Sequence, residues 1–223
     1  MQVNQILCAD CISAMATLPN DCVDFTLTDI PYNAVNLKEN KRASALRKLG
    51  KGKADILTFD LQTFLSAVYR VTKNNIAIFC GKEQFSEIFA FFANKKGTTR
   101  PIIWQKTNPP PLNAQYTYLS GIEMAVWHKK SKSKVFNAFY KNSVFCYPCG
   151  TSKIHPTEKN HALLADLIKD NTNEGDIVFD PCAGSGAHCL VAKNLNRRFL
   201  GFELDKDFAN KAQKRLLDLL SAI

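Results

Sequence analysis

Short apolar runs alternate along the chain with longer stretches in which apolar residues recur at helical spacing. The apolar runs predict strands at residues 5–9, 24–28, 75–80, 101–104, 123–127, 177–179 and 199–202. The periodic stretches predict helices at residues 61–71, 83–93, 158–168, 187–195 and 206–220. Because strands and helices alternate, we expect an α/β fold with a mostly parallel sheet.

The last predicted helix has a well-defined apolar face. Phe208, Ala212, Leu216 and Leu219 follow one another at spacings of three and four residues. This spacing places them in one stripe along a helix, so the helix should pack on the sheet through that stripe.

Two segments interrupt the alternation. Residues 38–53 contain seven basic residues, one acid and two glycines without clear periodicity, and we expect a mobile loop over residues 38–57. Residues 129–154 are first basic and then aromatic, and we interpret residues 107–154 as an insertion.

Composition limits the class of protein. A chain of 223 residues with 46% hydrophobic residues fits a single domain with a substantial core. Its 29 basic and 20 acidic residues give a formal charge of +9, which favours a polyanionic partner such as nucleic acid. The sequence has neither a membrane-spanning apolar run nor a signal peptide, so its eight cysteines predict free thiols in a soluble, cytoplasmic protein.

A glycine-rich turn follows the predicted strand at residues 177–179. Asp180 ends this strand, Gly184 and Gly186 flank a serine, and a predicted helix follows directly. Glycines let the backbone approach a ligand, and the free amides of a helix start attract a negative group. Glu203, 23 residues after Asp180, ends the next strand, where an acid typically accepts the ribose hydroxyls of a nucleotide. No Gly-Lys-Ser/Thr follows the glycines to bind a triphosphate, and the dinucleotide fingerprint is incomplete, so an adenosine ligand without a pyrophosphate fits better.

A second turn, Asp29-Ile30-Pro31-Tyr32, follows the strand at residues 24–28. Together with Asp180–Gly186, it resembles the paired catalytic and cofactor motifs of the β-class DNA amino-methyltransferases, which use S-adenosylmethionine. Ala9-Asp10-Cys11 and His155-Pro156-Thr157-Glu158-Lys159 resemble two further motifs of that family, in the family's order. The resemblance implies a Rossmann-like methyltransferase fold, a mostly parallel twisted sheet flanked by helices, with a small target-recognition insertion at residues 107–154.

The resemblance also implies roles for these residues. The catalytic residues would be Asp29, Ile30, Pro31 and Tyr32. The cofactor would be bound by Asp10, Cys11, Asp29, His155, Thr157, Lys159, Asp180, Pro181, Cys182, Ala183, Gly184, Ser185, Gly186 and Glu203. Ile30 stands where the family usually has proline, so its carbonyl is kept while some backbone stiffness is lost.

The chemistry of amino methylation suits these residue types. The amino nitrogen of adenine is a poor nucleophile because its lone pair is delocalised into the ring. The Asp29 carboxylate and the Ile30 carbonyl would accept its two hydrogens, which stabilises the positive charge that develops on nitrogen. Tyr32 would stack on a base that is flipped out of the duplex.

The cysteines suggest two other kinds of site, a zinc site and a catalytic nucleophile, and the sequence disfavours both. The pairs Cys8–Cys11 and Cys146–Cys149 have zinc-like spacing, but they lie far apart in the chain and we expect no metal. A Pro-Cys nucleophile for cytosine carbon is disfavoured because Cys182 lies inside the predicted cofactor turn.

Double-stranded DNA is the expected partner. We expect DNA contacts from the basic residues Lys38, Lys41, Arg42, Arg47, Lys48, Lys129 and Lys130. A homodimer and a cognate restriction endonuclease are further possible partners, the first by resemblance only. Methylation of the cytosine amino group, modification of RNA or protein, and a DNA-binding protein without activity remain alternative functions.

Overall fold

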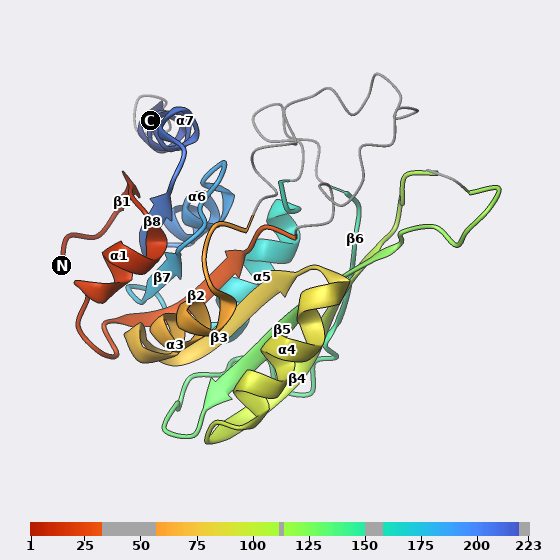
Figure 1. Ribbon diagram of the computed structural model, residues 1–223, viewed down its shortest axis with the longest axis horizontal. Helices are drawn as coiled ribbons and strands as arrows, with labels where there is room; N and C mark the ends of the chain where they lie inside the picture. Colours follow the sequence, from red (N-terminus) through yellow and green to blue (C-terminus); the bar gives the residue numbers. More distant parts are fainter. Residues whose placement is uncertain (33–56, 112–113, 150–157, 219–223) are drawn as a thin grey trace.

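An eight-stranded sheet forms the centre of the protein, described here from a computed structural model over residues 1–32, 57–111, 114–149 and 158–218 (Figure 1). The strands are β1 (Gln5–Cys8), β2 (Val23–Asp29), β3 (Thr72–Cys80), β4 (Gly97–Lys106), β5 (Ile122–Lys130), β6 (Val144–Tyr147), β7 (Ile177–Asp180) and β8 (Arg198–Glu203). Their order across the sheet is β1-β8-β7-β2-β3-β5-β4-β6. Only β5 runs antiparallel to its neighbours β3 and β4, and every other neighbouring pair is parallel.

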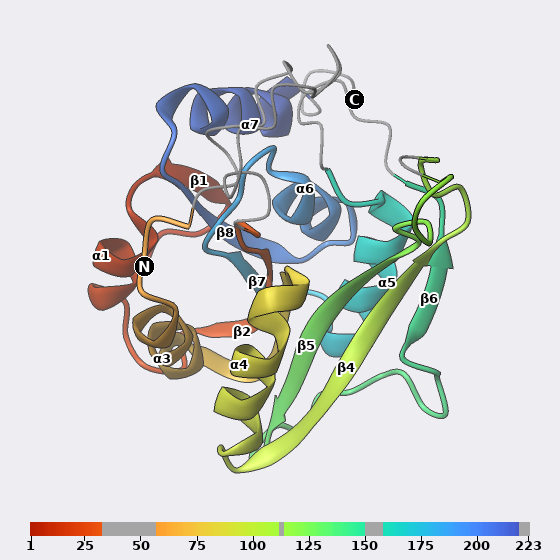
Figure 2. The ribbon, with the colours of Figure 1, turned by 45° about the vertical axis from the view of Figure 1, so that its right-hand side comes forward.

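Helices cover both faces of this sheet (Figures 1 and 2). One face packs against α1 (Cys11–Ala16), α3 (Leu61–Val71) and α4 (Lys82–Ala93). The other packs against α5 (His161–Asn171), α6 (Ala187–Asn194) and α7 (Lys206–Asp218). The predicted α/β fold with a mostly parallel sheet is therefore confirmed. No helix in the described ranges is long and apolar enough to span a membrane.

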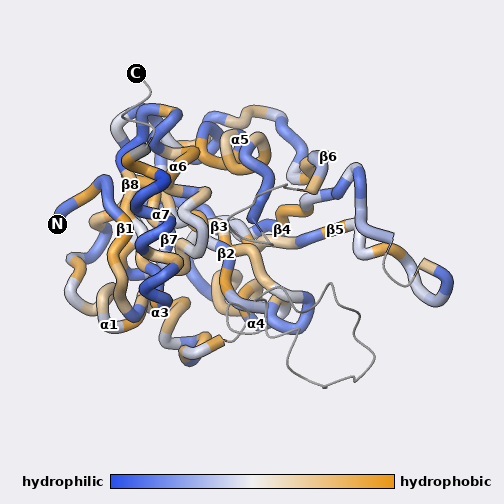
Figure 3. Tube along the Cα trace, turned by 90° about the horizontal axis from the view of Figure 1, so that it is seen from above, coloured by the Kyte–Doolittle hydropathy of each residue, from blue (hydrophilic) through white to orange (hydrophobic). Residues whose placement is uncertain are grey.

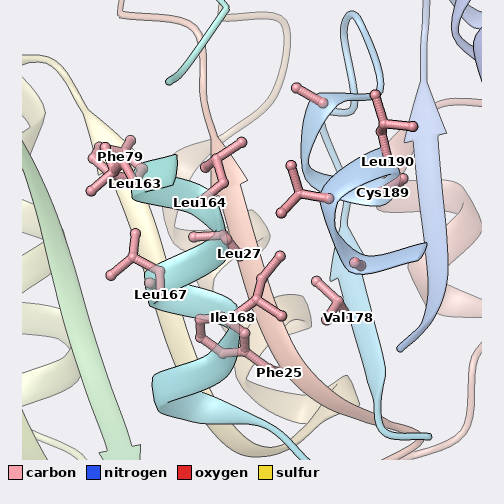
Figure 4. Close-up of a cluster of buried hydrophobic side chains, with 14 of the residues drawn as sticks. Phe25, Leu27, Phe79, Leu163, Leu164, Leu167, Ile168, Val178, Cys189 and Leu190 are labelled. Carbon is pink, nitrogen blue, oxygen red and sulfur yellow. The ribbon is translucent and has the colours of Figure 1, made fainter. Parts of the chain in front are cut away.

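The packing of α5 on the sheet shows how the apolar periodicity becomes a core (Figure 4). Its side chains at the spacing of one helix face are fully buried: Leu163, Leu164, Leu167 and Ile168. They lie against Phe25 and Leu27 of β2 and Phe79 of β3 in one buried cluster. Each such side chain contributes about 1.5–3 kcal/mol by leaving water. Figure 3 shows hydrophobic residues on the central strands.

The helix predicted over residues 158–168 begins later than expected. Asn160 caps α5, because its side-chain oxygen accepts hydrogen bonds from the amides of Ala162 (2.8 Å) and Leu163 (3.3 Å). Glu158 and Lys159 therefore precede the helix. Ion pairs with Arg215 and with Asp29 and Glu123, respectively, orient their side chains.

Two elements were not predicted, and the insertion is divided. Helix α1 and strand β6 are only six and four residues long, too short for a periodic signal. Residues 107–111 and 114–121 join β4 to β5 in a hairpin that projects from the sheet at the carboxyl ends of the parallel strands (Figure 1). Residues 131–143 join β5 to β6 and leave β5 at the opposite end of the strands, where the parallel strands begin.

His128 predicts a pH dependence of stability. Its ring is fully buried on β5, stacks on Phe92 with centroids 5.3 Å apart, and accepts or donates one hydrogen bond with Thr99 (3.0 Å). Burial, assisted by the positive charge of Lys130, lowers the pKa of His128 from 6.5 to about 4.

The unfolded chain therefore binds a proton that the folded protein does not, so the contribution of His128 is lost as pH falls from about 6.5 towards 4. We expect up to about 3 kcal/mol of stability to disappear across this range. His128→Phe keeps a stacked ring without a titratable nitrogen, so its denaturant-unfolding free energy should depend less on pH than that of the wild type. Equal slopes for the two proteins would contradict this assignment.

Candidate active site

A cavity of about 850 Å³ opens at the carboxyl ends of the parallel strands. It lies between the neighbouring strands β2 and β7, where the strand order reverses. From β2 the chain continues to β3 on one side, and from β7 it continues to β8 on the other side. Ligands of open α/β sheets typically bind at such a position. The predicted residues that line the cavity are Asp10, Cys11, Asp29, Ile30, Pro31, Tyr32, Lys159, Pro181, Cys182, Ala183, Gly184, Ser185 and Glu203.

Four predicted cofactor residues are not among those that line the cavity. His155 and Thr157 lie outside the described residues. Asp180 and Gly186 are described but lie behind the cavity wall. Gly186 has a positive φ of 74°, and a β-carbon there would approach Ile6 to 2.8 Å and Ala212 to 3.0 Å. This glycine is therefore required for packing against β1 and α7 as well as for the backbone turn.

Asp180 organises the glycine-rich turn from beneath. Its carboxylate is fully buried and accepts hydrogen bonds from the Thr28 hydroxyl (2.7 Å) and the Cys182 amide (3.1 Å). Its other oxygen lies 2.6 Å from Nδ1 of His188, on the first turn of α6. His188, which the sequence analysis did not single out, also lines the cavity, and its Nε2 has no partner among the described residues.

Glu203 lines the cavity at the end of β8 and also holds the turn. Its two oxygens accept hydrogen bonds from the amides of Gly184 (2.7 Å) and Asp205 (2.9 Å). Burial raises the pKa of the Glu203 carboxyl. Each carboxylate oxygen can accept a second hydrogen bond, so Glu203 can still accept from a ligand diol. Asp10 similarly caps α1 through the Ser13 amide (2.9 Å) while lining the cavity.

The Asp29–Tyr32 turn begins where β2 ends, beside the glycine-rich turn. Asp29 Oδ2 lies 2.5 Å from the Lys159 ammonium, whereas buried Oδ1 has no partner among the described residues. The Ile30 amide donates to the Phe79 carbonyl (3.2 Å), and the Ile30 side chain is 1% exposed. A proline at this position could not donate this hydrogen bond. The bond to β3 therefore holds the Ile30 backbone, which lacks the fixed φ angle of proline. Gln84 of α4 donates to the Pro31 carbonyl (2.8 Å).

A cluster of four charges lies at one side of this turn. The Lys159 ammonium is 2.9 Å from Glu123 Oε2 and 3.0 Å from the Tyr32 hydroxyl, and Lys106 is 2.8 Å from Glu123 Oε1. Burial alone would raise the pKa of Glu123, but Lys159 and Lys106 outweigh it and lower that pKa to about 2. Burial, together with Asp29 and Glu123, raises the pKa of Tyr32 well above 10. Tyr32 is therefore neutral at physiological pH.

Glu123, Lys106 and His188 are among the cavity-lining residues that sequence analysis missed. Glu123 interrupts an otherwise apolar run at the start of β5. A charged residue in such a run must find a partner when the strand is buried, and this would have been a usable signal. His188 offered no comparable signal, because its partner Asp180 is identified only when the turn and helix are built.

Cys182 contacts Cys11 in the cavity wall. The hydrogen bond between these thiols, together with burial and the Asp180 charge, raises the pKa of Cys182 well above 9. A thiolate nucleophile is thereby disfavoured. Cys8 of β1 is exposed, and β1 and β6 are the two outermost strands of the sheet, on opposite sides. The Cys8–Cys11 and Cys146–Cys149 pairs are thus on separate edges, and the described residues contain no group of three or more that could hold a metal.

The predicted DNA contacts are only partly described. Lys38, Lys41, Arg42, Arg47 and Lys48 lie outside the described residues. Lys129 and Lys130 lie away from the cavity. They end β5, which runs antiparallel to β3 and therefore ends where the parallel strands begin. Lys129 donates to the Ser133 carbonyl (2.8 Å), and Lys130 forms an ion pair with Asp21 (2.9 Å). Both ammonium groups therefore have partners within the protein.

Comparison with known proteins identifies the family. A family model described as DNA methylase matches residues 23–214. The chain belongs to this DNA methylase family. It is 26% identical to the type II methyltransferase M.HinfI of Haemophilus influenzae over 249 aligned positions, covering 97% of the chain and 69% of the relative. It is 35% identical to M2.DpnII of Streptococcus pneumoniae over 133 positions, covering 52% of the chain and 49% of the relative.

Two solved structures share its architecture. The complex of M1.HpyAVI with SAM is 29% identical, with a TM-score of 0.70, covering 95% of this chain and 98% of that one. The cytosine-N4-specific PvuII DNA methyltransferase has a TM-score of 0.72 at 14% identity, covering 97% of this chain and 90% of that one, and shows the fold alone. This DNA methylase therefore has the predicted Rossmann-like methyltransferase fold.

Glu203 provides a test of the predicted cofactor site. Glu203→Ala should weaken S-adenosylmethionine binding by about 1–3 kcal/mol, because ligand hydroxyls would lose a buried acceptor. Isothermal titration calorimetry measures this change directly. Glu174→Ala, which removes an exposed carboxylate before β7, is the matched control. Equal affinity in the wild type and Glu203→Ala would show that the ribose contact lies elsewhere.

Proposed function

We propose that this DNA methylase methylates the exocyclic amino group of adenine in double-stranded DNA, in a base flipped out of the duplex. The observation that carries the proposal is Asp29, which lines the cavity at the end of β2 and whose buried Oδ1 has no hydrogen-bond partner among the described residues. A buried oxygen without a hydrogen-bond donor is costly, so this position favours a ligand that brings an N–H group. The amino group of a base does so.

S-adenosylmethionine fits the other half of the cavity. The Glu203 and Asp10 carboxylates offer acceptors for a ribose diol and an adenine amino group, and Phe208 of α7 adds an apolar wall. Gly184, with a φ of 50°, brings the backbone to the cavity. When bound, this cofactor supplies a methyl group attached to a positively charged sulfur.

The residues of the catalytic turn would act on the target base. The Asp29 carboxylate and the Ile30 carbonyl accept the two amino hydrogens, which increases electron density on nitrogen as positive charge develops there. Tyr32 provides an aromatic surface for stacking. Its hydroxyl donates to Glu123 Oε2 (3.2 Å), and this contact fixes the orientation of the ring.

Adenine is the proposed base because the catalytic turn begins with aspartate, as in the adenine type of motif that it resembles. The decisive experiment incubates the protein with methyl-labelled cofactor and duplex DNA, and then identifies the modified nucleoside by chromatography and mass spectrometry. N6-methyladenine is the expected product. N4-methylcytosine would correct the base while leaving the class of reaction intact.

The β4–β5 hairpin supports DNA as the partner. Leu119, Ser120, Gly121 and Ile122 line the cavity, so the hairpin borders its mouth. Tyr116 and Tyr118 stand beside them with 84% and 100% of their surfaces exposed. Aromatic rings that are this exposed at the mouth of a base-binding cavity can stack on nucleotides that flank a flipped base. We propose that this part of residues 107–154 contributes to target recognition, whereas the basic and aromatic residues at the opposite edge do not.

The assembly around this activity is also a proposal. The similarity to type II methyltransferases favours a cognate restriction endonuclease with the same target sequence. A homodimer remains a prediction from family resemblance.

Asp29→Ala should reduce methyl transfer by at least about 100-fold, the scale on which one transition-state hydrogen bond acts. Cofactor affinity should change little, because the cofactor contacts proposed at Glu203 and Gly184 are kept. Single-turnover rates at saturating cofactor, together with calorimetric dissociation constants, measure both quantities. Asp207→Ala, an exposed acid on α7, is the control. An active Asp29→Ala enzyme would remove the catalytic assignment.

Replacing Tyr116 and Tyr118 together with alanine should weaken DNA binding by about 10-fold or more, because each base–aromatic stack is worth about 1–3 kcal/mol. Cofactor affinity should not change. Fluorescence anisotropy with labelled duplex DNA measures the first quantity. Tyr140→Ala is a matched control, since Tyr140 is equally exposed but lies in the β5–β6 connection at the opposite edge. If both variants bind DNA equally well, the hairpin does not contact DNA.

A further inference from the structure

Lys159 is a buried cation whose partners all belong to the base side of the cavity. The side chain is 3% exposed, and its ammonium contacts Asp29 (2.5 Å), Glu123 (2.9 Å) and the Tyr32 hydroxyl (3.0 Å). These three contacts correspond to the three donors that a lysine ammonium has. A lysine that served the cofactor would have to give up one of them.

The charges in this cluster balance. Asp29 and Glu123 supply two carboxylates, and Lys159 and Lys106 supply two ammonium groups. Leaving one charge of such a buried set unpaired is strongly unfavourable. Burial would lower the pKa of Lys159, but Asp29 and Glu123 outweigh it and raise that pKa. The lysine therefore remains charged at physiological pH.

The geometry also orients Asp29. Lys159 binds Oδ2, which restricts rotation of the carboxylate, and Oδ1 has no partner in the part of the chain that the structure describes. Lys159 is itself held from two sides, by the α5 cap at Asn160 and by Glu123. The lysine thus connects the start of α5 and the start of β5 to the end of β2.

We propose that Lys159 is a positioning residue for methyl transfer, which holds the Asp29 carboxylate in the orientation that accepts from the target amino group, with Glu123 as the carboxylate that holds Lys159 in place. The inference rests on the proposed function of Asp29, and it replaces the role beside the cofactor that the sequence predicted for Lys159.

Removal of the cation has a specific electrostatic consequence. Among the described residues, the groups facing Asp29 are Lys159 before α5, Glu123 of β5, Cys80 of β3 and Tyr32 of its own turn, with Lys106 of β4 behind Glu123. Without Lys159, Asp29 is a partly buried carboxylate beside a second carboxylate. Both burial and the like charge then favour its protonated form, which cannot accept the amino hydrogens as well.

The test uses Lys159→Met, Lys159→Arg and the double variant Lys159→Met/Glu123→Gln, with Lys73→Met as the control. Lys73 is 61% exposed at the opposite edge of the sheet. The single-turnover rate of methyl transfer to duplex DNA is measured from acidic to alkaline pH at saturating cofactor. Cofactor dissociation constants and thermal unfolding are measured on the same preparations.

We expect Lys159→Met to bind the cofactor like the wild type and to transfer methyl groups about 100-fold more slowly at neutral pH, the cost of a misplaced reacting group. Its rate should rise with pH, as Asp29 loses its proton. Lys159→Arg should keep the pH profile of the wild type. In the double variant the rising limb should move to lower pH, because the second carboxylate is gone.

Three results would overturn the inference. A Lys159→Met enzyme with weakened cofactor binding and an unchanged rate at saturation would assign Lys159 to the cofactor. A rate lowered equally at every pH would show a purely structural role. If Lys159→Met does not fold, a wild-type pH profile in Glu123→Gln alone would count against the coupling. The absence of methyl transfer from the wild-type protein would instead overturn the proposed function itself.

Discussion

The Asp180 carboxylate joins the two halves of the active site. It is fully buried at the end of β7, where an unpaired charge would be strongly unfavourable, and it is bound by Thr28, His188 and the Cys182 amide. Thr28 is the residue before Asp29, so the carboxylate that holds the glycine-rich turn also holds the strand that ends in the catalytic turn. The distance between the two turns is therefore fixed by these hydrogen bonds together with the direct pairing of β2 and β7 in the sheet.

The direction of β5 determines which charged residues surround Asp29 and Tyr32. Because β5 runs antiparallel to β3, its first residues lie at the edge where the parallel strands end. Glu123 thereby enters the site, where Lys106 from the end of β4 and Lys159 from the start of α5 balance its charge. The same direction carries Lys129 and Lys130 to the far edge. One reversed strand thus places an acid in the site and removes two basic residues from it.

The cavity divides into two regions with different chemistry. The turns after β7 and β8 present backbone groups, Glu203 and small side chains, which suit a nucleoside with hydroxyl groups. The end of β2, the start of β5, the end of β4 and the residue before α5 present a balanced set of charges around Tyr32. The hairpin between β4 and β5 borders this second region with exposed tyrosines.

Local sequence determined the strands, the longer helices and both turns. Alternating apolar runs are read from neighbouring residues, and a strand followed by Asp-Ile-Pro-Tyr or by a Gly-Ser-Gly turn is contained within about ten residues. The Asn160 cap, which sets the start of α5, is also a local signal. It was missed because the apolar periodicity continues before it and moved the predicted start to residue 158.

Only the tertiary structure decided which side chains meet. Lys159 contacts Asp29 and Glu123 because α5, β2 and β5 converge at one edge of the sheet, and His188 contacts Asp180 because α6 folds back over β7. Gly186 is required by Ile6 and Ala212, residues from opposite ends of the chain. The sequence predicts each element from short-range periodicity, whereas partners distant in the chain are chosen by sheet order and strand direction, which depend on packing of the whole fold.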